Sequence, residues 1–140
     1  MPKLTKSVKE SNSFPNSDVP FINLAILPSN ASRIAANNIK VTAKSRVNYI
    51  LEGVDLNGEV YGDDPVVTIL EGDTVNFNID APGHPFFIKT TPGTGKKNQV
   101  EGIENNGTTR GQISWTPLKK GTYYYQCSKH KSMFGKIIVN

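Results

Sequence analysis

The sequence predicts an all-β fold, a Greek-key β-sandwich or barrel of about seven or eight short strands. Three observations carry this prediction. The apolar runs are short, turn residues separate them about every 8–12 positions, and several of them alternate apolar with polar residues. The 12 glycines and 9 prolines among 140 residues favour strands and turns, and no segment has a convincing helical pattern.

The first part of the chain is predicted to be a basic, extended N-terminal arm. Residues 1–46 carry seven Lys or Arg and two acidic residues, a net charge of +5, whereas residues 47–140 carry a net charge of −1. Within the arm, residues 1–20 are polar, and residues 21–27 and 39–43 have strand-like apolar patterns. The predicted organisation is therefore an arm, residues 1–46, followed by one folded domain, residues 47–140.

The folded domain is predicted to contain a regular series of strands. Turn signals separate them, such as Asn57-Gly58 between two apolar segments. Residues 91–110 are rich in Gly, Thr, Asn and Lys, and they predict a long loop with one short strand near Val100. The predicted strands are residues 47–56, 59–61, 66–70, 74–80, 84–90, 112–116, 123–127 and 134–139.

The composition excludes several classes of protein. No stretch approaches the roughly 20 apolar residues of a membrane-spanning helix. The first residues lack the apolar core of a secretory signal, so a cytoplasmic or virion-associated location is expected unless a signal lies outside this sequence. A single cysteine excludes an internal disulfide. The arm has no dense basic run, so we do not expect nucleic acid as a partner.

Four residues with soft donor atoms form a candidate metal site. Cys127, His130 and Met133 are spaced three residues apart between two strand-like segments, and His84, the only other histidine, opens another segment. A thiolate, two imidazoles and a weak axial thioether are the donors of a blue-copper electron-transfer site. Zinc would use the thiolate and the imidazoles but has no use for a thioether. The donor set therefore predicts copper, one ion per chain.

Each of these residues also has a simpler explanation when it is taken alone. Cys127 is a small apolar residue that suits a core, and Met133 would fill one. His84 would suit a turn, and His130 a solvated loop. Their joint spacing favours the metal site. The alternative is a fold that keeps all four residues without binding a metal.

Three motifs carry a resemblance to a known family: EGDTVNFNIDAPGHPFFI, GQISWTP and GTYYYQCSKHKSMFGKIIVN. Together they resemble the cupredoxin, or plastocyanin-like, family over about residues 47–140. The resemblance implies a cupredoxin fold and a short ligand loop similar to that of amicyanin. The copper ligands that it implies are His84, Cys127, His130 and Met133.

The chain departs from the family pattern in two respects. Pro85 follows the first histidine, where plastocyanins usually have an asparagine that braces the ligand loop. Proline brings neither a side-chain donor nor a backbone donor to the hydrogen bonds that tune such a site. The second departure is the lack of an export signal, because single-domain cupredoxins usually work outside the cytoplasm.

The resemblance implies a one-electron carrier and not an enzyme. A single cysteine cannot form a binuclear copper centre, and both histidines are committed to one site, which leaves none for a catalytic copper. A nucleophilic pair of Cys127 and His130 would lack a third group to orient it.

Lysines surround the predicted electron port. In the family, the edge of the second ligand histidine reaches the surface and passes the electron. Here Lys129 and Lys131 flank His130, and further lysines are expected at the same end. They predict docking to an acidic redox protein. The further lysines are Lys89, Lys96 and Lys97.

A structural or attachment protein, for example a virion surface or decoration protein, is the alternative function. In that case residues 1–46 would dock to a larger assembly or to further copies of the chain, and copper would be incidental or absent.

Overall fold

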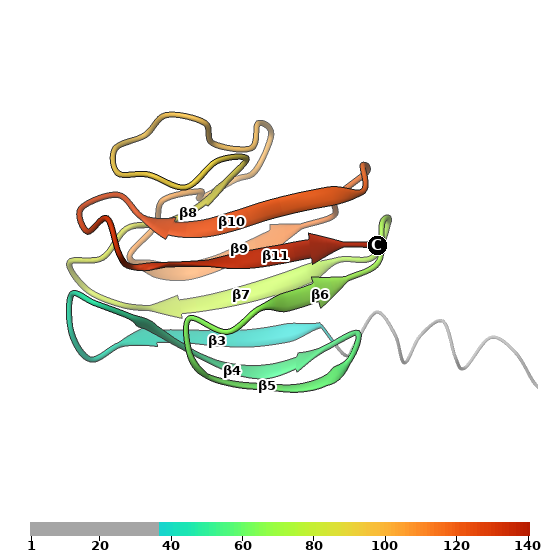
Figure 1. Cartoon of the computed structure of the whole chain (residues 1–140), viewed down its shortest axis with the longest axis horizontal. Helices are drawn as coiled ribbons and strands as arrows, with labels where there is room; N and C mark the ends of the chain where they lie inside the picture. The colour runs from blue at the N-terminus through green and yellow to red at the C-terminus, as the bar shows by residue number, and fades with distance from the viewer. Residues whose placement is uncertain (1–36) are drawn as a thin grey trace, which may run out of the picture. The chain divides into compact units, whose positions relative to one another are not determined.

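The computed structural model describes residues 37–140, which lie within one compact unit (Figure 1). These residues form nine β-strands and no helix, which confirms the predicted all-β class, and none of them belongs to a helix that could span a membrane. The strands are β3 (Asn38–Ala43), β4 (Tyr49–Asp55), β5 (Gly58–Asp63), β6 (Val67–Ile69), β7 (Val75–Asp80), β8 (Phe86–Lys89), β9 (Arg110–Trp115), β10 (Gly121–Cys127) and β11 (Phe134–Val139).

The strands form two sheets that pack into a sandwich. One sheet has the order β6-β11-β10-β8, and the other has the order β5-β4-β3-β7-β9. Two neighbouring pairs are parallel, β3 with β7 and β6 with β11, and the remaining pairs are antiparallel. Each parallel pair joins strands that are far apart in the sequence, so both sheets depend on long-range pairing.

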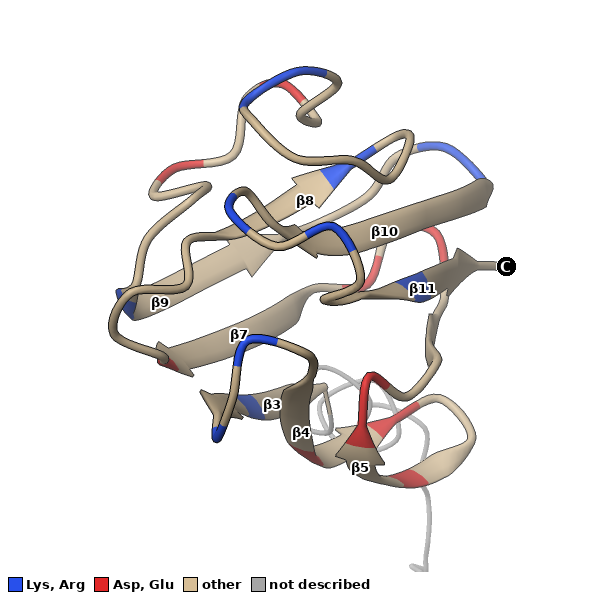
Figure 2. Ribbon diagram, turned by 60° about the vertical axis from the view of Figure 1, so that its left-hand side comes forward, with Lys and Arg blue, Asp and Glu red and all other residues tan. Residues whose placement is uncertain are grey.

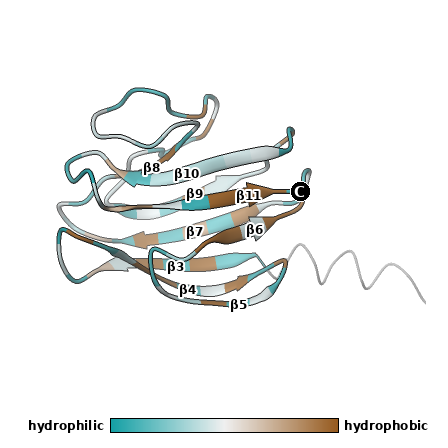
Figure 3. Cartoon of the chain, in the orientation of Figure 1, coloured by the Kyte–Doolittle hydropathy of each residue, from teal (hydrophilic) through white to brown (hydrophobic). Residues whose placement is uncertain are grey.

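The core lies between the inner faces of the two sheets. In β7, for example, Val75, Phe77 and Ile79 are buried, while the polar residues between them are more exposed. Figure 3 shows this alternation of apolar and polar residues in β3, β4 and β7. The largest buried side chains are aromatic, and Phe86 packs against both Tyr49 and Tyr125 with ring centroids 5.0 and 5.4 Å away. Such rings contribute much of the apolar burial that stabilises a small sandwich.

The boundary predicted between residues 46 and 47 falls inside this fold. Strand β3 lies within the predicted arm, yet it is an internal strand of the five-stranded sheet, paired with both β4 and β7. Its residues Ile39 and Val41 are fully buried in the core. The arm interpretation is therefore wrong for this segment, and residues 1–36 of the predicted arm lie outside the described residues.

Two local features differ from the sequence prediction. The tight turn between β4 and β5 consists of Leu56 and Asn57, because Asp55 pairs directly with Gly58, so the turn lies one residue earlier than predicted. The short strand expected near Val100 is a single bridge between Lys89 and Gln99.

The loops after β7 and after β10 lie at the same end of the sandwich, as Figure 1 shows. The first loop contains His84, and the second runs from Ser128 to Met133. Since β8 pairs with β10, with Phe86 opposite Cys127, the start of one strand meets the end of the other. This register brings the two loops together and builds the candidate site.

Candidate metal centre

A tight turn after β7 places His84. Pro82 and Gly83 interrupt the strand, and Gly83 has a φ of 83°, which a residue with a side chain rarely adopts. The amide of His84 donates to the carbonyl of Ala81 at 3.0 Å, closing the turn. The imidazole of His84 is thereby held at the end of the sandwich.

Cys127 is the last residue of β10, and its side chain is fully buried. Alternation along β10 directs Tyr125 and Cys127 to the core face, as the sequence predicts. The amide of Cys127 donates to the carbonyl of Met133 at 2.9 Å, which closes the ligand loop at its base. The thiol is therefore fixed by the strand on one side and by the loop closure on the other.

The ligand loop, which we define as residues 128–133, carries the two remaining candidates. The amide of Met133 donates to the carbonyl of His130 at 3.1 Å, so the loop turns back on itself between them. Met133 is fully buried, whereas His130 is partly exposed. This arrangement leaves His130 partly accessible to solvent and keeps the thioether in the interior.

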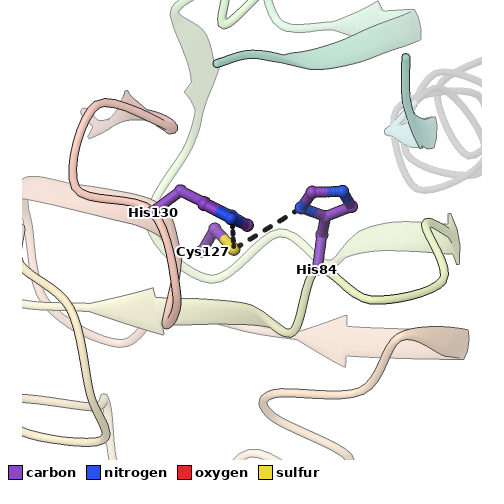
Figure 4. Close-up of side chains that lie close together, drawn as sticks. All are labelled: His84, Cys127 and His130. Carbon is purple, nitrogen blue, oxygen red and sulfur yellow. Dashed lines mark hydrogen bonds between the residues drawn. The ribbon is translucent and has the colours of Figure 1, made fainter. Parts of the chain in front are cut away.

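Three of the four predicted ligands converge on one point, as Figure 4 shows. Nδ1 of His130 lies 3.4 Å from Sγ of Cys127, and Nδ1 of His84 lies 3.9 Å from the same sulfur. All three donor atoms lie within 4.8 Å of one another. The two imidazole rings approach with centroids 5.0 Å apart. Two nitrogens and one sulfur therefore form a compact triangle of donors.

Hydrogen bonds join the two loops that supply these donors. The amide of Ser128 donates to the carbonyl of Pro85 at 3.2 Å. The hydroxyl of Tyr49, a fully buried residue of the opposite sheet, donates to the carbonyls of His84 at 2.9 Å and Pro85 at 3.0 Å. Although Pro85 itself has no donor, its loop accepts hydrogen bonds both from the ligand loop, through Ser128, and from the opposite sheet, through Tyr49.

The end of the sandwich that carries the site is rich in basic residues. Lys129 and Lys131 are exposed on either side of His130, and Figure 2 shows further basic segments on neighbouring loops, while acidic segments lie around β4 and β5 and on several other loops. Burial lowers the pKa of His84, and the nearby charges of His130, Lys129 and Arg46 lower it further. A neutral imidazole, the form that binds a metal, is thus favoured at His84.

Lys89, which the sequence predicts among the exposed lysines of this end, is instead buried. Only 1% of the residue is exposed, and Nζ donates to the carbonyls of Gly93 at 2.6 Å and Gly95 at 2.8 Å. Its ammonium also lies 5.7 Å from the centroid of the Phe87 ring. Burial lowers the pKa of Lys89. The expected group of docking lysines therefore does not include Lys89.

Sequence reasoning also missed two residues that support the site, Tyr49 and Gln126. Tyr49 stands in a strand whose pattern indicates a core residue, and nothing in the sequence reveals that its hydroxyl reaches the His84 loop. Gln126 precedes the cysteine, on the strand face that alternation assigns to solvent, but it is fully buried. A glutamine within the apolar run before the cysteine is the signal that could have drawn attention to it.

Comparisons with known proteins agree with this architecture. No protein-family model matches the chain, and no curated protein matches it. Among solved structures, a structure of the copper protein rusticyanin is similar with a TM-score of 0.52 and 20% identity, covering 81% of this chain and 94% of that chain. A methionine-to-glutamine variant of rusticyanin is similar with a TM-score of 0.50 at the same identity and coverage. The chain therefore has the cupredoxin fold, which confirms the fold that the sequence motifs imply.

Proposed function

We propose that this protein binds one copper ion in a type 1 site and acts as a one-electron carrier. Cys127, His84 and His130 would supply the equatorial donors, and Met133 would supply a weak axial thioether. The observation that carries the proposal is the triangle of one sulfur and two imidazole nitrogens, all within 4.8 Å of one another.

The distances between the donor atoms fit the binding of a single metal ion. Bonds of about 2.3 Å to sulfur and about 2.0 Å to nitrogen, roughly 120° apart, separate the two donor atoms by about 3.7 Å. The two sulfur–nitrogen distances at the site, 3.4 and 3.9 Å, bracket this value. Both sulfur–nitrogen separations therefore already lie within a few tenths of an ångström of the value that a trigonal ion needs.

The chemistry of the donors favours copper over other metals. A thiolate with two imidazoles and an optional thioether suits copper, which at such a site alternates between Cu(I) and Cu(II). The chain's own contribution is rigidity, because strand β10, the closed loop and the opposite sheet all fix the donors. Because the donors are fixed, they would move little when the copper changes oxidation state, and the barrier to electron transfer would be small. The proposed activity is electron carriage and not catalysis.

An acidic redox protein is the proposed partner. The partly exposed imidazole of His130 offers a path for the electron to the surface, and the exposed side chains of Lys129 and Lys131 flank it. Complementary charge would steer a negatively charged partner toward this face and raise the association rate.

The alternative of an attachment protein depends on the predicted arm. Strand β3 takes residues 38–43 out of that arm and commits them to the sheet, which leaves less of it for docking. No observation on residues 37–140 favours the attachment role over electron carriage.

Visible absorption spectroscopy with added copper tests the proposal. One equivalent of Cu(II) added to the purified wild-type protein is expected to give an intense blue thiolate-to-copper band. The Cys127→Ser variant, which replaces the sulfur with oxygen at nearly the same size, is expected to lack the band. A wild-type protein that stays colourless, or a band of equal intensity in Cys127→Ser, would contradict the proposed function.

A further inference from the structure

Gln126 occupies an unusual place for a long polar side chain. Alternation along β10 directs it away from the core that holds Tyr125 and Cys127, on the outer face of the four-stranded sheet. This face is not open to solvent at this position, and Gln126 is fully buried. The segment after β8 covers it, because the amide of Gly93 donates to Oε1 of Gln126 at 3.0 Å. A carboxamide buried in this way is costly unless its polar atoms are all bonded.

The nitrogen of the same carboxamide binds the ligand loop. Nε2 of Gln126 donates to the carbonyl of Cys127 at 2.8 Å and to the carbonyl of His130 at 2.9 Å, with the carbonyl of Met133 at 3.4 Å. These three carbonyls belong to the three donor residues of β10 and the ligand loop. The backbone from Cys127 to Met133 is thus gathered around one amide nitrogen.

Lys89 indirectly supports the side-chain oxygen of Gln126, because it binds the segment that donates to this oxygen. Nζ of Lys89 donates to the carbonyls of Gly93 and Gly95, and the amide of Gly95 donates to the carbonyl of Ser128 at 2.8 Å. The segment 93–95 is therefore held by a buried ammonium from one side and by the ligand loop from the other. Movement of the ligand-loop backbone at the bonded carbonyls would break bonds to Gln126 or to this segment.

We propose that Gln126 is the positioning residue of the metal centre: its carboxamide holds the backbone of Cys127, His130 and Met133 in the geometry that binds the metal. The inference rests on the proposed function for the metal, but the contacts that carry it join protein atoms only. Gln126 acts through the backbone and touches no metal. Its bonds set the orientation of the sulfur and of the imidazole, which in turn set the reduction potential.

The first test is made on the wild-type protein without metal. The side-chain amide protons of Gln126 are expected to exchange with solvent as slowly as the backbone amides of β10, because both lie in closed hydrogen bonds. Exchange at the rate of an exposed glutamine such as Gln112 would overturn the proposal. This measurement depends on no variant and on no copper.

The second test uses two substitutions with a matched control. Gln126→Met keeps the length of the side chain and removes all its hydrogen bonds, whereas Gln126→Glu keeps an acceptor for Gly93 and removes the donor to the loop. Gln112→Met, an exposed glutamine on strand β9, is the control. In the metal-free proteins, the backbone amides of Cys127 and Met133 are expected to exchange at least about tenfold faster in both Gln126 variants than in the control.

The copper forms of the variants separate positioning from general stability. Gln126→Met is expected to move the blue band and to change the ratio of Cu(II) to Cu(I) affinity about tenfold, about 59 mV in potential. A lower melting temperature with unchanged loop exchange, band position and potential would overturn the proposal. If the wild type binds no copper, the proposed function fails, and the exchange rates alone decide the role of Gln126.

Discussion

The hydroxyl of Tyr49 lies 2.9 Å from the carbonyl oxygen of His84, which it reaches from the opposite sheet of the sandwich. The same hydroxyl donates to the carbonyl of Pro85, so one buried group holds both residues of the loop after β7. Burial raises the pKa of Tyr49, and the neighbouring Cys127 and Asp64 raise it further, so the hydroxyl keeps its proton. The sheet opposite the ligand loop thereby fixes the position of the first imidazole.

Tyr49→Phe is expected to lower the free energy of unfolding by about 1–2 kcal/mol, because it removes the hydroxyl that donates to the carbonyls of His84 and Pro85 and creates almost no cavity. Urea denaturation of the metal-free protein measures this change. Tyr61→Phe is the control, since Tyr61 is 69% exposed. The copper form of Tyr49→Phe is also expected to lose its metal faster. Equal effects of the two substitutions would show that the bonds to His84 and Pro85 contribute nothing.

Met133→Leu tests the axial ligand of the proposed centre. The two side chains are close in volume, so the cost in stability is expected to be below about 1.5 kcal/mol. Loss of the thioether removes an electron donor from the metal, which disfavours Cu(II), so the reduction potential is expected to rise. Cyclic voltammetry measures the shift, and Ile137→Val, another substitution in the buried core, serves as the control. An unchanged potential would mean that Met133 is a core residue only.

Asp64 is expected to make the stability of the protein depend on pH. Burial raises the pKa of its carboxyl from 3.8 to about 6, despite the bond that it accepts from the amide of Tyr49, and the charge of Asp63 adds to the shift. Because the folded chain holds this proton more tightly than the unfolded chain, its stabilising contribution is complete below about pH 4. The contribution is lost as the pH rises through about 6, and its size is about 1–3 kcal/mol.

Asp64→Asn isolates this contribution, since asparagine keeps the acceptor and tolerates the φ of 45° at this position. Urea denaturation at several pH values between 4 and 7 is expected to show that the wild type loses stability relative to the variant across this range. A constant difference between the two proteins would refute the shifted pKa.

Lys129 and Lys131 are expected to control the rate of electron exchange with anionic partners. The double substitution Lys129→Gln and Lys131→Gln should lower the rate with ferricyanide several-fold at low ionic strength, on the order of a factor of 3–10. The matched control is Lys119→Gln with Lys120→Gln, two exposed lysines in the turn before β10, at the opposite end of that strand.

The wild-type rate is expected to fall as salt is added, because salt screens charges separated by more than about 8–10 Å. A wild-type rate that is indifferent to salt, or a control pair with the same effect as the site pair, would contradict the docking role.

The sequence predicts the strands of this fold well because burial on one face imposes an alternating pattern. Val75, Phe77 and Ile79 reveal β7, and Tyr125 and Cys127 reveal the inward face of β10. Alternation is a local property, and each strand can be recognised without its partners. The same pattern marks residues 39–43 as a strand, but their membership of the sheet depends on pairing with β7, a distant strand that local patterns cannot identify.

The supporting contacts of the candidate site are harder to predict because they depend on the path of a loop. The alternation of side chains along each strand places Lys89 and Gln126 on the outer face of the four-stranded sheet. Both residues would be exposed if no loop covered this face. The segment around Gly93 and Gly95 folds over them and supplies carbonyl and amide partners, which changes their environment from water to protein interior. No pattern within residues 91–110 fixes that path, since a loop rich in glycine and polar residues is compatible with many conformations.

The strand order also has a consequence for the protein during its synthesis. All five strands of one sheet precede β10 in the sequence, whereas the other sheet needs β10 and β11 before it can close. Strand β6 pairs only with β11, and Val67 lies opposite Ile137. At translation rates of about 5–20 residues per second, a nascent chain would hold β6 without its neighbour for several seconds. The ribosome-bound chain is therefore expected to present an apolar sheet face to chaperones before its cysteine and second histidine emerge.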